Sequence, residues 1–370
     1  CAGSLIGKPS LLRIEDKGDK FEVTTNLMDL NKDRFGVKPR IAVHPETDLI
    51  ICNDGSAELN GYDGLTGNEV KLPFPNGADV ATGLDGNWYI QIGSSYSGYI
   101  CRFDKNLKEI PVAEPAVGGY LGRAAADKNE KPLINALGFV YGRMGAGFST
   151  FGAAVDKLGR VYSLQMYIWS AYCVAIFGPN GQPEDPGRFK EDPDMKKTGR
   201  FNSAIIVPIG TKCGGIQLDY KNNIYLGLSA FPLDHKPPFG FDKDEGYQAC
   251  VGSVVKFKAE GGSIVKADKA PAGKPGIKLS RPFHGVVNEF FAENAERCYP
   301  ELGCLGGDLN DGCICRQPMF QVDGWGRIFI PNALTCSVRI VDNEGNLIQK
   351  LGSYGNIDSR RGTEGKGPKI

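Results

Sequence analysis

The stretch 320–356, FQVDGWGRIFIPNALTCSVRIVDNEGNLIQKLGSYGN, decides the fold because it contains two consecutive β-hairpins. In the first hairpin, Phe320, Val322, Ile328 and Ile330 are apolar at alternate positions, which is the period of a strand with one buried face. The turn formers Asp-Gly-Trp-Gly at 323–326 separate the two apolar pairs. This segment therefore predicts two antiparallel strands joined by a tight turn.

A second hairpin follows at 338–352, where apolar positions flank the turn sequence Asp-Asn-Glu-Gly at 342–345. Two hairpins in under about forty residues form a sheet that is too small to be stable alone. Such a sheet needs similar sheets packed against it, so the rest of the chain should contain further copies.

The copies are present. The core of the first hairpin is an apolar residue, Asp, two turn residues, Gly, a polar residue, a β-branched residue and an aromatic residue. It recurs fully at 155–162, recurs with Asn in place of Gly at 218–225, and recurs in weaker form at 82–89 and 43–50. A shorter version of the second hairpin follows each copy. A repeated four-stranded unit of about forty residues is typical of a propeller blade.

The pattern V-D-x-x-G-x-[IV]-[YF] followed by [RV]-I-x-[FVD]-[DG]-x-x-G resembles the NHL repeat. The resemblance implies a β-propeller of about six blades, used most often as a rigid binding platform and occasionally as an enzyme. We therefore predict an all-β, six-bladed propeller with long loop insertions. The predicted units lie near 40–74, 79–113, 151–182, 213–267 and 319–352.

Closure of the propeller is predicted to be incomplete within this chain. Residues 8–25, and Leu11 to Val23 in particular, resemble only the second hairpin of a unit, and the polar tail or linker 357–370 offers no matching first hairpin. We expect this half-blade to lack its two inner strands, which the remainder of a larger polypeptide or a partner would supply. The alternative is a first hairpin too degenerate to recognise.

Composition excludes some classes of partner. The formal net charge is zero, which argues against bulk electrostatic attraction to nucleic acid or to an anionic membrane. No segment reaches 18 uninterrupted apolar residues, so no membrane span is predicted.

Eleven cysteines indicate disulfides and an oxidising compartment, so we expect an extracellular, periplasmic or cell-surface location. Four of them, Cys298, Cys304, Cys313 and Cys315, fall in one Gly-rich and Asp-rich insertion and are predicted to be oxidised. Their spacing, C-x5-C-x8-C-x-C, lacks the C-x2-C pairs of common zinc and iron–sulfur sites, although a metal site stays an alternative. Cys213 and Cys250 are a second candidate pair.

Cys1 is a candidate lipid anchor. A chain that begins Cys-Ala-Gly-Ser resembles a bacterial lipoprotein, whose first residue is an acylated cysteine. The alternative is an excised fragment that begins at this residue by chance.

The histidines define the rival, enzymatic interpretation. One branch of the NHL-like propellers is a zinc-dependent lyase with histidines on its central channel, and this chain has three: His44, His235 and His284. His44 replaces the turn Asp of its unit, while His235 and His284 lie in separate insertions. We therefore predict that no two of them share a metal and that the chain carries no catalytic residues.

Other cofactor motifs are weak. Asp308, Asn310 and Asp311 have the oxygen density of a calcium loop without the EF-hand spacing, so calcium is a candidate and a solvated turn is the alternative. There is no C-x-x-C-H sequence, so no covalent c-type haem is predicted.

The insertions are the predicted binding elements. They span 114–150, 178–212, 228–250 and 268–317, and their aromatic residues either contact a partner or pack the loops onto the body. The binding candidates are Tyr120, Tyr141, Phe239, Phe241 and Tyr247.

The predicted function is a non-catalytic scaffold for protein–protein interaction in a bacterial extracellular or envelope assembly. Two alternatives stay open. One is a zinc lyase or hydrolase with its site in the channel, and the other is a structural subunit of a cytochrome-containing electron-transfer assembly.

Overall fold

A computed structural model of the chain describes residues 2–5, 8–16, 21–29, 40–53, 59–74, 77–93, 97–111, 136–141, 153–168, 171–180, 205–207, 213–242, 244, 247, 251–283, 286–303, 320–332 and 334–352. Every element with bounds in these ranges is a β-strand except η2, one turn of 3-10 helix (Ala267–Lys269). The fold is therefore all-β, as predicted. No helix in this part of the chain is long and apolar enough to cross a membrane.

Two sheets have four antiparallel strands in chain order, which is the predicted blade. One contains β4 (Arg40–Val43), β5 (Leu49–Asn53), β6 (Leu59–Asp63) and β7 (Glu69–Val70). The other contains β8 (Gly77–Thr82), β9 (Trp88–Gly93), β10 (Ser97–Phe103) and β11 (Ala136–Tyr141).

Three further groups of strands repeat this arrangement inside two larger sheets. The first group is β12 (Ala153–Val155), β13 (Val161–Ile168), β14 (Ala171–Phe177) and β15 (Ile205–Val207). The second is β16 (Cys213–Leu218), β17 (Ile224–Leu228), β19 (Val251–Phe257) and β23 (Ala295–Gly303). The third is β24 (Gln321–Val322), β25 (Ile328–Asn332), β26 (Ser337–Val341) and β27 (Leu347–Leu351). One parallel pair, Gly303 with Asn332, joins the second group to the third.

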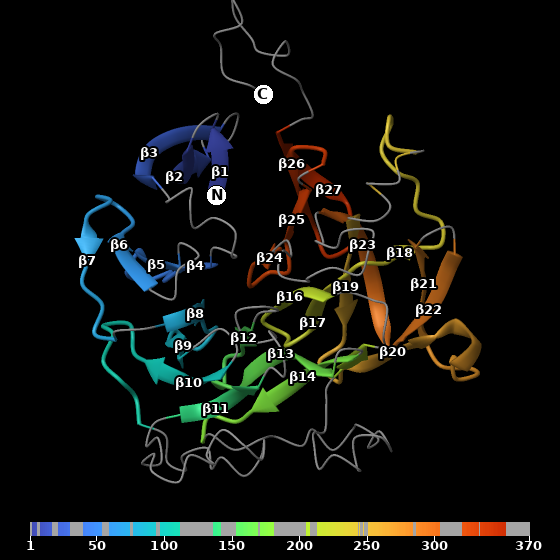
Figure 1. Cartoon of the computed structure of the whole chain (residues 1–370), viewed down its shortest axis with the longest axis horizontal. Coiled ribbons are helices and arrows are strands. Elements are labelled where there is room, and N and C mark those ends of the chain that lie inside the picture. Colours follow the sequence, from blue (N-terminus) through green and yellow to red (C-terminus); the bar gives the residue numbers. More distant parts are fainter. Residues whose placement is uncertain are drawn as a thin grey trace, which may run out of the picture.

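The groups stand around a common axis as the blades of a propeller (Figure 1). The first strand of each group lies on the axis side, because β4 contacts β8, β8 contacts β12, β12 contacts β16 and β16 contacts β24. The number of blades stays a prediction, because the second and third groups belong to one sheet and a further sheet has three described strands.

That other sheet contains β1 (Ala2–Leu5), β2 (Lys8–Asp16) and β3 (Phe21–Asp29), in the order β1-β2-β3. The hairpin of β2 and β3 confirms the pairing predicted for 8–25. The expectation that both inner strands are missing is wrong by one strand, because β1 pairs with β2 from Ala2–Leu11 to Leu5–Lys8. Within the described residues, no strand pairs with the other edge of β1.

The outermost strands correct the predicted boundaries of three units. β11, β15 and β23 lie inside the ranges 114–150, 178–212 and 268–317, which were predicted as insertions. In each case the chain leaves the sheet after the third strand and returns later to pair with it. Local sequence cannot show this, because the returning strand has no turn that links it directly to its partner.

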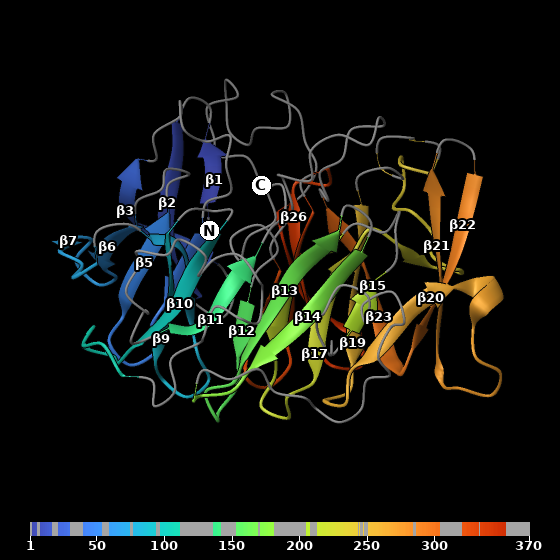
Figure 2. The same ribbon diagram turned by 60° about the horizontal axis from the view of Figure 1, so that its bottom comes forward.

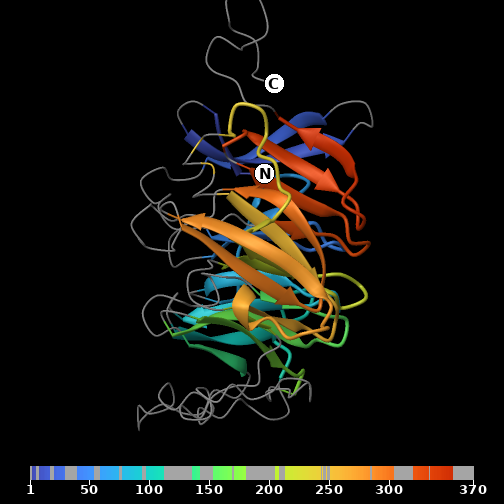
Figure 3. The same cartoon turned by 90° about the vertical axis from the view of Figure 1, so that its right-hand side faces the viewer.

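The excursion between β19 and β23, together with β18 from the segment before β19, builds a second layer of strands. β20 (Gly262–Lys266) pairs in parallel with β15, and the sheet continues through β22 (Val286–Glu293) and β21 (Gly276–Phe283) to β18 (Phe231–Pro232). Figure 3 shows these strands, in orange, crossing the outside of the ring. Ile264, Leu279 and Phe290 from this layer join one hydrophobic core with residues of β13 and β17.

The hydrophobic core lies between neighbouring sheets and follows the period-two pattern. Phe320, Val322, Ile328 and Ile330 are all buried in one cluster, which confirms the alternation predicted for the hairpin at 320–330. Burial of one such side chain contributes roughly 1.5–3 kcal/mol. Neighbouring groups of strands therefore bury side chains against each other in shared clusters.

Candidate binding surface at the axis

Five turns surround the axis at one end of the propeller, and together they form what we call the turn face. Each follows the first strand of a group, and they span residues 44–48, 83–87, 156–160, 219–223 and 323–327. The turns that follow β12 and β16 lie along the lower edge of Figure 2. Neighbouring turns contact one another, as His44 does with Gly86 and Tyr220 with Trp325.

In three of these turns, both carboxylate oxygens of an aspartate accept hydrogen bonds from the same loop. Oδ1 of Asp156, Asp219 and Asp323 accepts the backbone N–H groups two and four residues further on, at 2.8–3.1 Å. Oδ2 accepts a side-chain bond from the fourth residue: Arg160 Nε (2.6 Å), Asn223 Nδ2 (2.8 Å) and Arg327 Nε (2.6 Å). These carboxylates therefore stiffen the turns.

The residue three positions after the aspartate explains the Gly or Asn of the repeat. Gly159, Asn222 and Gly326 have φ values of 76°, 62° and 87°. Side chains with a Cβ rarely adopt this left-handed conformation, and Asn tolerates it better than most. The substitution of Asn for Gly at 222 thus preserves the turn.

His44 closes its turn in the way that the aspartates close theirs. Its Nδ1 accepts the Glu46 N–H at 3.2 Å, and its Nε2 donates to the Gly86 carbonyl of the neighbouring turn at 3.0 Å. The imidazole is buried beside the Trp88 ring, with centroids 5.4 Å apart. With both ring nitrogens engaged, His44 links two turns and has no nitrogen left for a metal.

Asp85 takes the place of a missing turn aspartate. Gly83 occupies the aspartate position of its turn, and a Cβ there would lie 2.1 Å from Asp85 Oδ1. The Asp85 carboxylate fills that space and accepts bonds from Asn87 and, at 2.7 Å, from the Tyr89 hydroxyl. Burial, together with the charge of Asp85, raises the pKa of Tyr89.

Large apolar side chains project from three consecutive turns. Leu158, Tyr220 and Trp325 are 67%, 45% and 75% exposed. The rings of Tyr220 and Trp325 meet edge to face, with centroids 6.4 Å apart, and the Lys157 ammonium lies 4.1 Å from the Tyr220 centroid. We call Lys157, Leu158, Tyr220 and Trp325 the turn patch.

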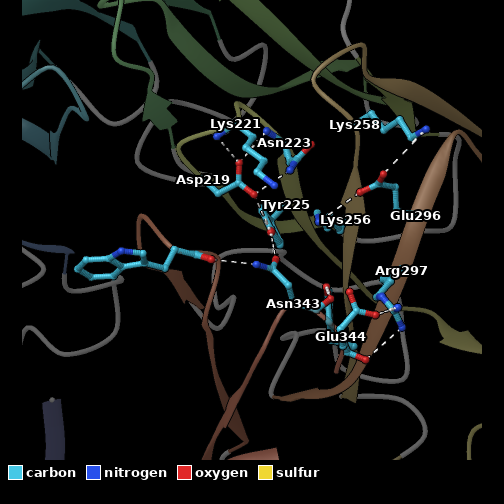
Figure 4. Close-up of polar contacts among 12 residues, drawn as sticks. Asp219, Lys221, Asn223, Tyr225, Lys256, Lys258, Glu296, Arg297, Asn343 and Glu344 are labelled. Carbon is cyan, nitrogen blue, oxygen red and sulfur yellow. Dashed lines mark hydrogen bonds and ion pairs between the residues drawn. The ribbon is translucent and has the colours of Figure 1, made fainter. Parts of the chain in front are cut away.

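A chain of polar contacts links the turns that carry the turn patch (Figure 4). The Tyr225 hydroxyl lies 3.0 Å from Asp219 Oδ2 and 2.9 Å from Asn343 Oδ1, and Asn343 Nδ2 donates to the Trp325 carbonyl at 2.9 Å. Burial, followed by the charge of Asp219, raises the pKa of Tyr225. The backbones of the Tyr220 and Trp325 turns are therefore tied to each other.

Several ion pairs lie beside this polar chain. Glu296 contacts Lys256 at 3.2 Å and Lys258 at 4.0 Å, and Arg297 binds Glu344 (Figure 4). Exposed Lys157 and Lys221 differ, because no carboxylate of the described residues lies within ion-pair distance of either ammonium.

The predicted binding aromatics of the 228–250 insertion behave differently from one another. Tyr247 is fully buried and stacked with Phe231 and His235, which agrees with the alternative that these aromatic residues pack the insertion onto the body. Phe241 packs against the Tyr247 ring at 5.3 Å. Phe239 is 104% exposed, as a binding residue would be. Tyr141 is described only as backbone in β11, and Tyr120 lies outside the described residues.

His235 belongs to that aromatic stack. Its ring is parallel to Phe231, with centroids 4.6 Å apart, and its Nε2 lies 3.5 Å from the Tyr247 hydroxyl. Burial, then the charge of Arg339, lowers the pKa of His235. His284 lies outside the described residues, and no group of three or more His, Cys, Asp or Glu in the described ranges could hold a metal.

The described residues include two of the six predicted disulfide cysteines and none of the predicted calcium ligands. Cys298 is a free, partly buried cysteine, which disagrees with its predicted disulfide, and desolvation of the thiol raises its pKa to about 12. Cys213 lies in β16, where its backbone is described. Seven predicted positions lie outside the described residues: Cys250, Cys304, Cys313, Cys315, Asp308, Asn310 and Asp311.

Sequence reasoning missed the turn patch. The repeat was defined with two unspecified turn residues after the aspartate, and such residues are normally solvated. The signal was an apolar or aromatic residue at this place, at Leu158, Tyr220 and Trp325.

No family matches the chain, and no curated protein matches it. Among solved structures it is similar to a streptogramin B lyase (9% identity, 88% of this chain and 86% of the other, TM-score 0.36). It is also similar to a gluconolactonase of Xanthomonas campestris (13%, 94% and 86%, 0.37) and to a chain of a nidogen/laminin complex (9%, 93% and 89%, 0.39). At these values no activity or partner transfers to the chain.

Proposed function

We propose that the chain is a non-catalytic propeller platform that binds a protein partner through the turn patch. The observation that carries this proposal is the exposure of Tyr220 and Trp325 on turns that are tied together. Tyr and Trp dominate the energetics of protein interfaces, because they offer a large contact area with few rotatable bonds. A rigid backbone lowers the entropy cost of binding.

The state of the polar groups near the axis supports binding rather than catalysis. The turn aspartates are saturated by hydrogen bonds from their own loops, and His44 uses both ring nitrogens to join two turns. Groups held in this way act as structural supports. The exposed chemistry of the turn patch is apolar and cationic, which suits recognition.

The setting of this platform is part of the proposal. We place it in a bacterial extracellular or envelope assembly because eleven cysteines are unusual for a chain kept in a reducing compartment. Cys101 and Cys298 are free thiols, so the disulfides of this proposal involve other cysteines. Counting thiols in the denatured chain, with and without reductant, tests it: eleven free thiols without reductant would contradict an oxidising compartment.

The binding proposal is tested with a random peptide library displayed on phage and selected on the whole chain. We expect enriched peptides whose binding is lost on Trp325→Ala or Tyr220→Ala. Phe239→Ala is the matched control, because it removes an equally exposed aromatic side chain from the 228–250 insertion. Failure to enrich any peptide would overturn the proposal. Binding that survives Trp325→Ala but is lost on Phe239→Ala would assign recognition to the insertion instead.

A further inference from the structure

We infer that the turn patch accepts an acidic peptide segment that also carries a large apolar side chain. This inference rests on the proposed function and specifies the partner. Carboxylates of the segment lie against Lys157 and Lys221, and its apolar side chain contacts Trp325 and Leu158.

The first step is the placement of charge in the three turns that carry the turn patch. Asp156 and Asp219 are buried, and Asp323 is bound to Arg327, so the negative groups of these turns are covered by their own loops. The two exposed lysines have no such partner in the described part of the chain. The charge that a ligand meets is therefore positive.

Two carboxylates on the neighbouring turns are engaged within the protein, whereas Asp48 is exposed on the turn that follows β4. Glu46 is paired with Lys105 at 2.9 Å, and the Asp85 carboxylate is bonded to Asn87 and Tyr89. Exposed ions of opposite sign stay attracted over about 8–10 Å at physiological salt, so an anionic segment is favoured at the turn patch.

The second step is the arrangement of cation and apolar surface. The Lys157 ammonium lies 4.1 Å from the Tyr220 centroid, and the Tyr220 ring meets Trp325 edge to face. A carboxylate that pairs with Lys157 is thus one aromatic ring away from Trp325. Residues next to each other in an extended peptide are spaced about 3.3–3.6 Å apart along the chain, so an acidic residue and a nearby apolar residue can reach both features.

The third step separates a peptide from a phosphate-rich ligand. Bidentate phosphate recognition favours arginine, and the arginines of these turns, Arg160 and Arg327, are bonded to Asp156 and Asp323. Two lysines beside apolar surface match carboxylates and a hydrophobic side chain better. Single-stranded nucleic acid could still stack on Trp325, so it is included as an outcome of the test.

The experiment measures fluorescence anisotropy with three labelled nine-residue peptides. The first has three glutamates around one tryptophan, the second has glutamines in place of the glutamates, and the third has lysines. A labelled oligothymidine of the same length is the fourth probe. We expect the acidic peptide to bind at least threefold more tightly than the neutral one, and the preference to shrink at high salt.

Variants locate the charge. Lys157→Ala and Lys221→Ala should each weaken the acidic peptide by up to about fivefold, the size expected for an exposed ion pair. Lys157→Glu with Lys221→Glu should reverse the preference toward the lysine peptide. Lys278→Ala on β21 is the control and should change nothing, since Lys278 is an exposed lysine away from the turns.

The outcomes separate this inference from the proposed function. If the acidic and neutral peptides bound equally and both lost binding on Trp325→Ala, the charge inference would be overturned and the proposed function would be unaffected. Tighter binding of oligothymidine than of any peptide would overturn the peptide inference. The peptide inference would also be overturned if none of the probes bound and the peptide library yielded Trp325-dependent binders without acidic residues. A library that yields no binders removes the proposed function itself.

Discussion

Tyr220 meets Trp325 edge to face, with ring centroids 6.4 Å apart and an interplanar angle of 84°. The two residues belong to turns of neighbouring groups of strands, and the Tyr220 N–H donates to the Gly324 carbonyl at 3.3 Å. The contact leaves no room at Gly324, where a Cβ would lie 2.0 Å from the Tyr220 ring. The Trp325 turn and the Tyr220 ring therefore constrain each other.

Gly324→Ala should displace the Tyr220 ring and lower the free energy of unfolding by about 1–3 kcal/mol, the usual cost of overpacking. Chemical denaturation followed by tryptophan fluorescence measures this. In a Tyr220→Ala background the same substitution should cost much less, because the clashing ring is gone. An equal cost in both backgrounds would show that Gly324 is required for another reason.

Tyr225→Phe should lower the free energy of unfolding by about 1–3 kcal/mol, because it removes the hydroxyl that lies between Asp219 Oδ2 and Asn343 Oδ1, of which Asp219 Oδ2 still accepts from Asn223 Nδ2. It should also weaken peptide binding at the turn patch. Tyr220→Phe is the matched control. It also removes a tyrosine hydroxyl, but the Tyr220 ring is exposed, so the free energy of unfolding should change little. Similar losses in both variants would contradict the polar chain as a support.

His44→Ala should lower the free energy of unfolding by about 1–3 kcal/mol, because the Glu46 N–H and the Gly86 carbonyl lose their partner. His44→Asp should recover part of this loss, since a carboxylate can cap the turn as Asp156 does. Metal analysis of the purified protein should be the same before and after either substitution. Loss of a stoichiometric metal with His44 would contradict its structural role.

Cys101 and Cys298 should react slowly with a thiol reagent at pH 8 in the native protein and at once after denaturation. Burial raises the pKa of both thiols to about 12, against 9.0 when unfolded. Between these values the native state keeps a proton that the unfolded state has lost, so stability should fall as the pH rises from 9 toward 12. Denaturation at several pH values measures the slope, and replacing both cysteines by Ala should reduce it. Rapid native labelling would show that the thiols are accessible.

The sequence alone determined the local structure of this protein. Alternation of apolar residues and the Asp-x-x-Gly turns predicted the hairpin of Phe320 to Ile330, and the structure buries the four expected side chains. The turn role of His44 was also predicted, because it stands where the other copies have aspartate. These features depend on residues within a few positions of each other, so the physical chemistry of a short segment is enough to specify them.

Tertiary structure alone decided which segments complete each sheet and which side chains reach the surface. β23 pairs with β19 after an excursion that includes three other strands, and nothing within the segment 295–303 marks its partner. Tyr247 is buried because Phe231 and His235 stack on it, whereas Trp325 stays exposed on a turn. Pairing and burial of this kind depend on which sheets become neighbours around the axis, and that is a property of the closed ring rather than of any single repeat.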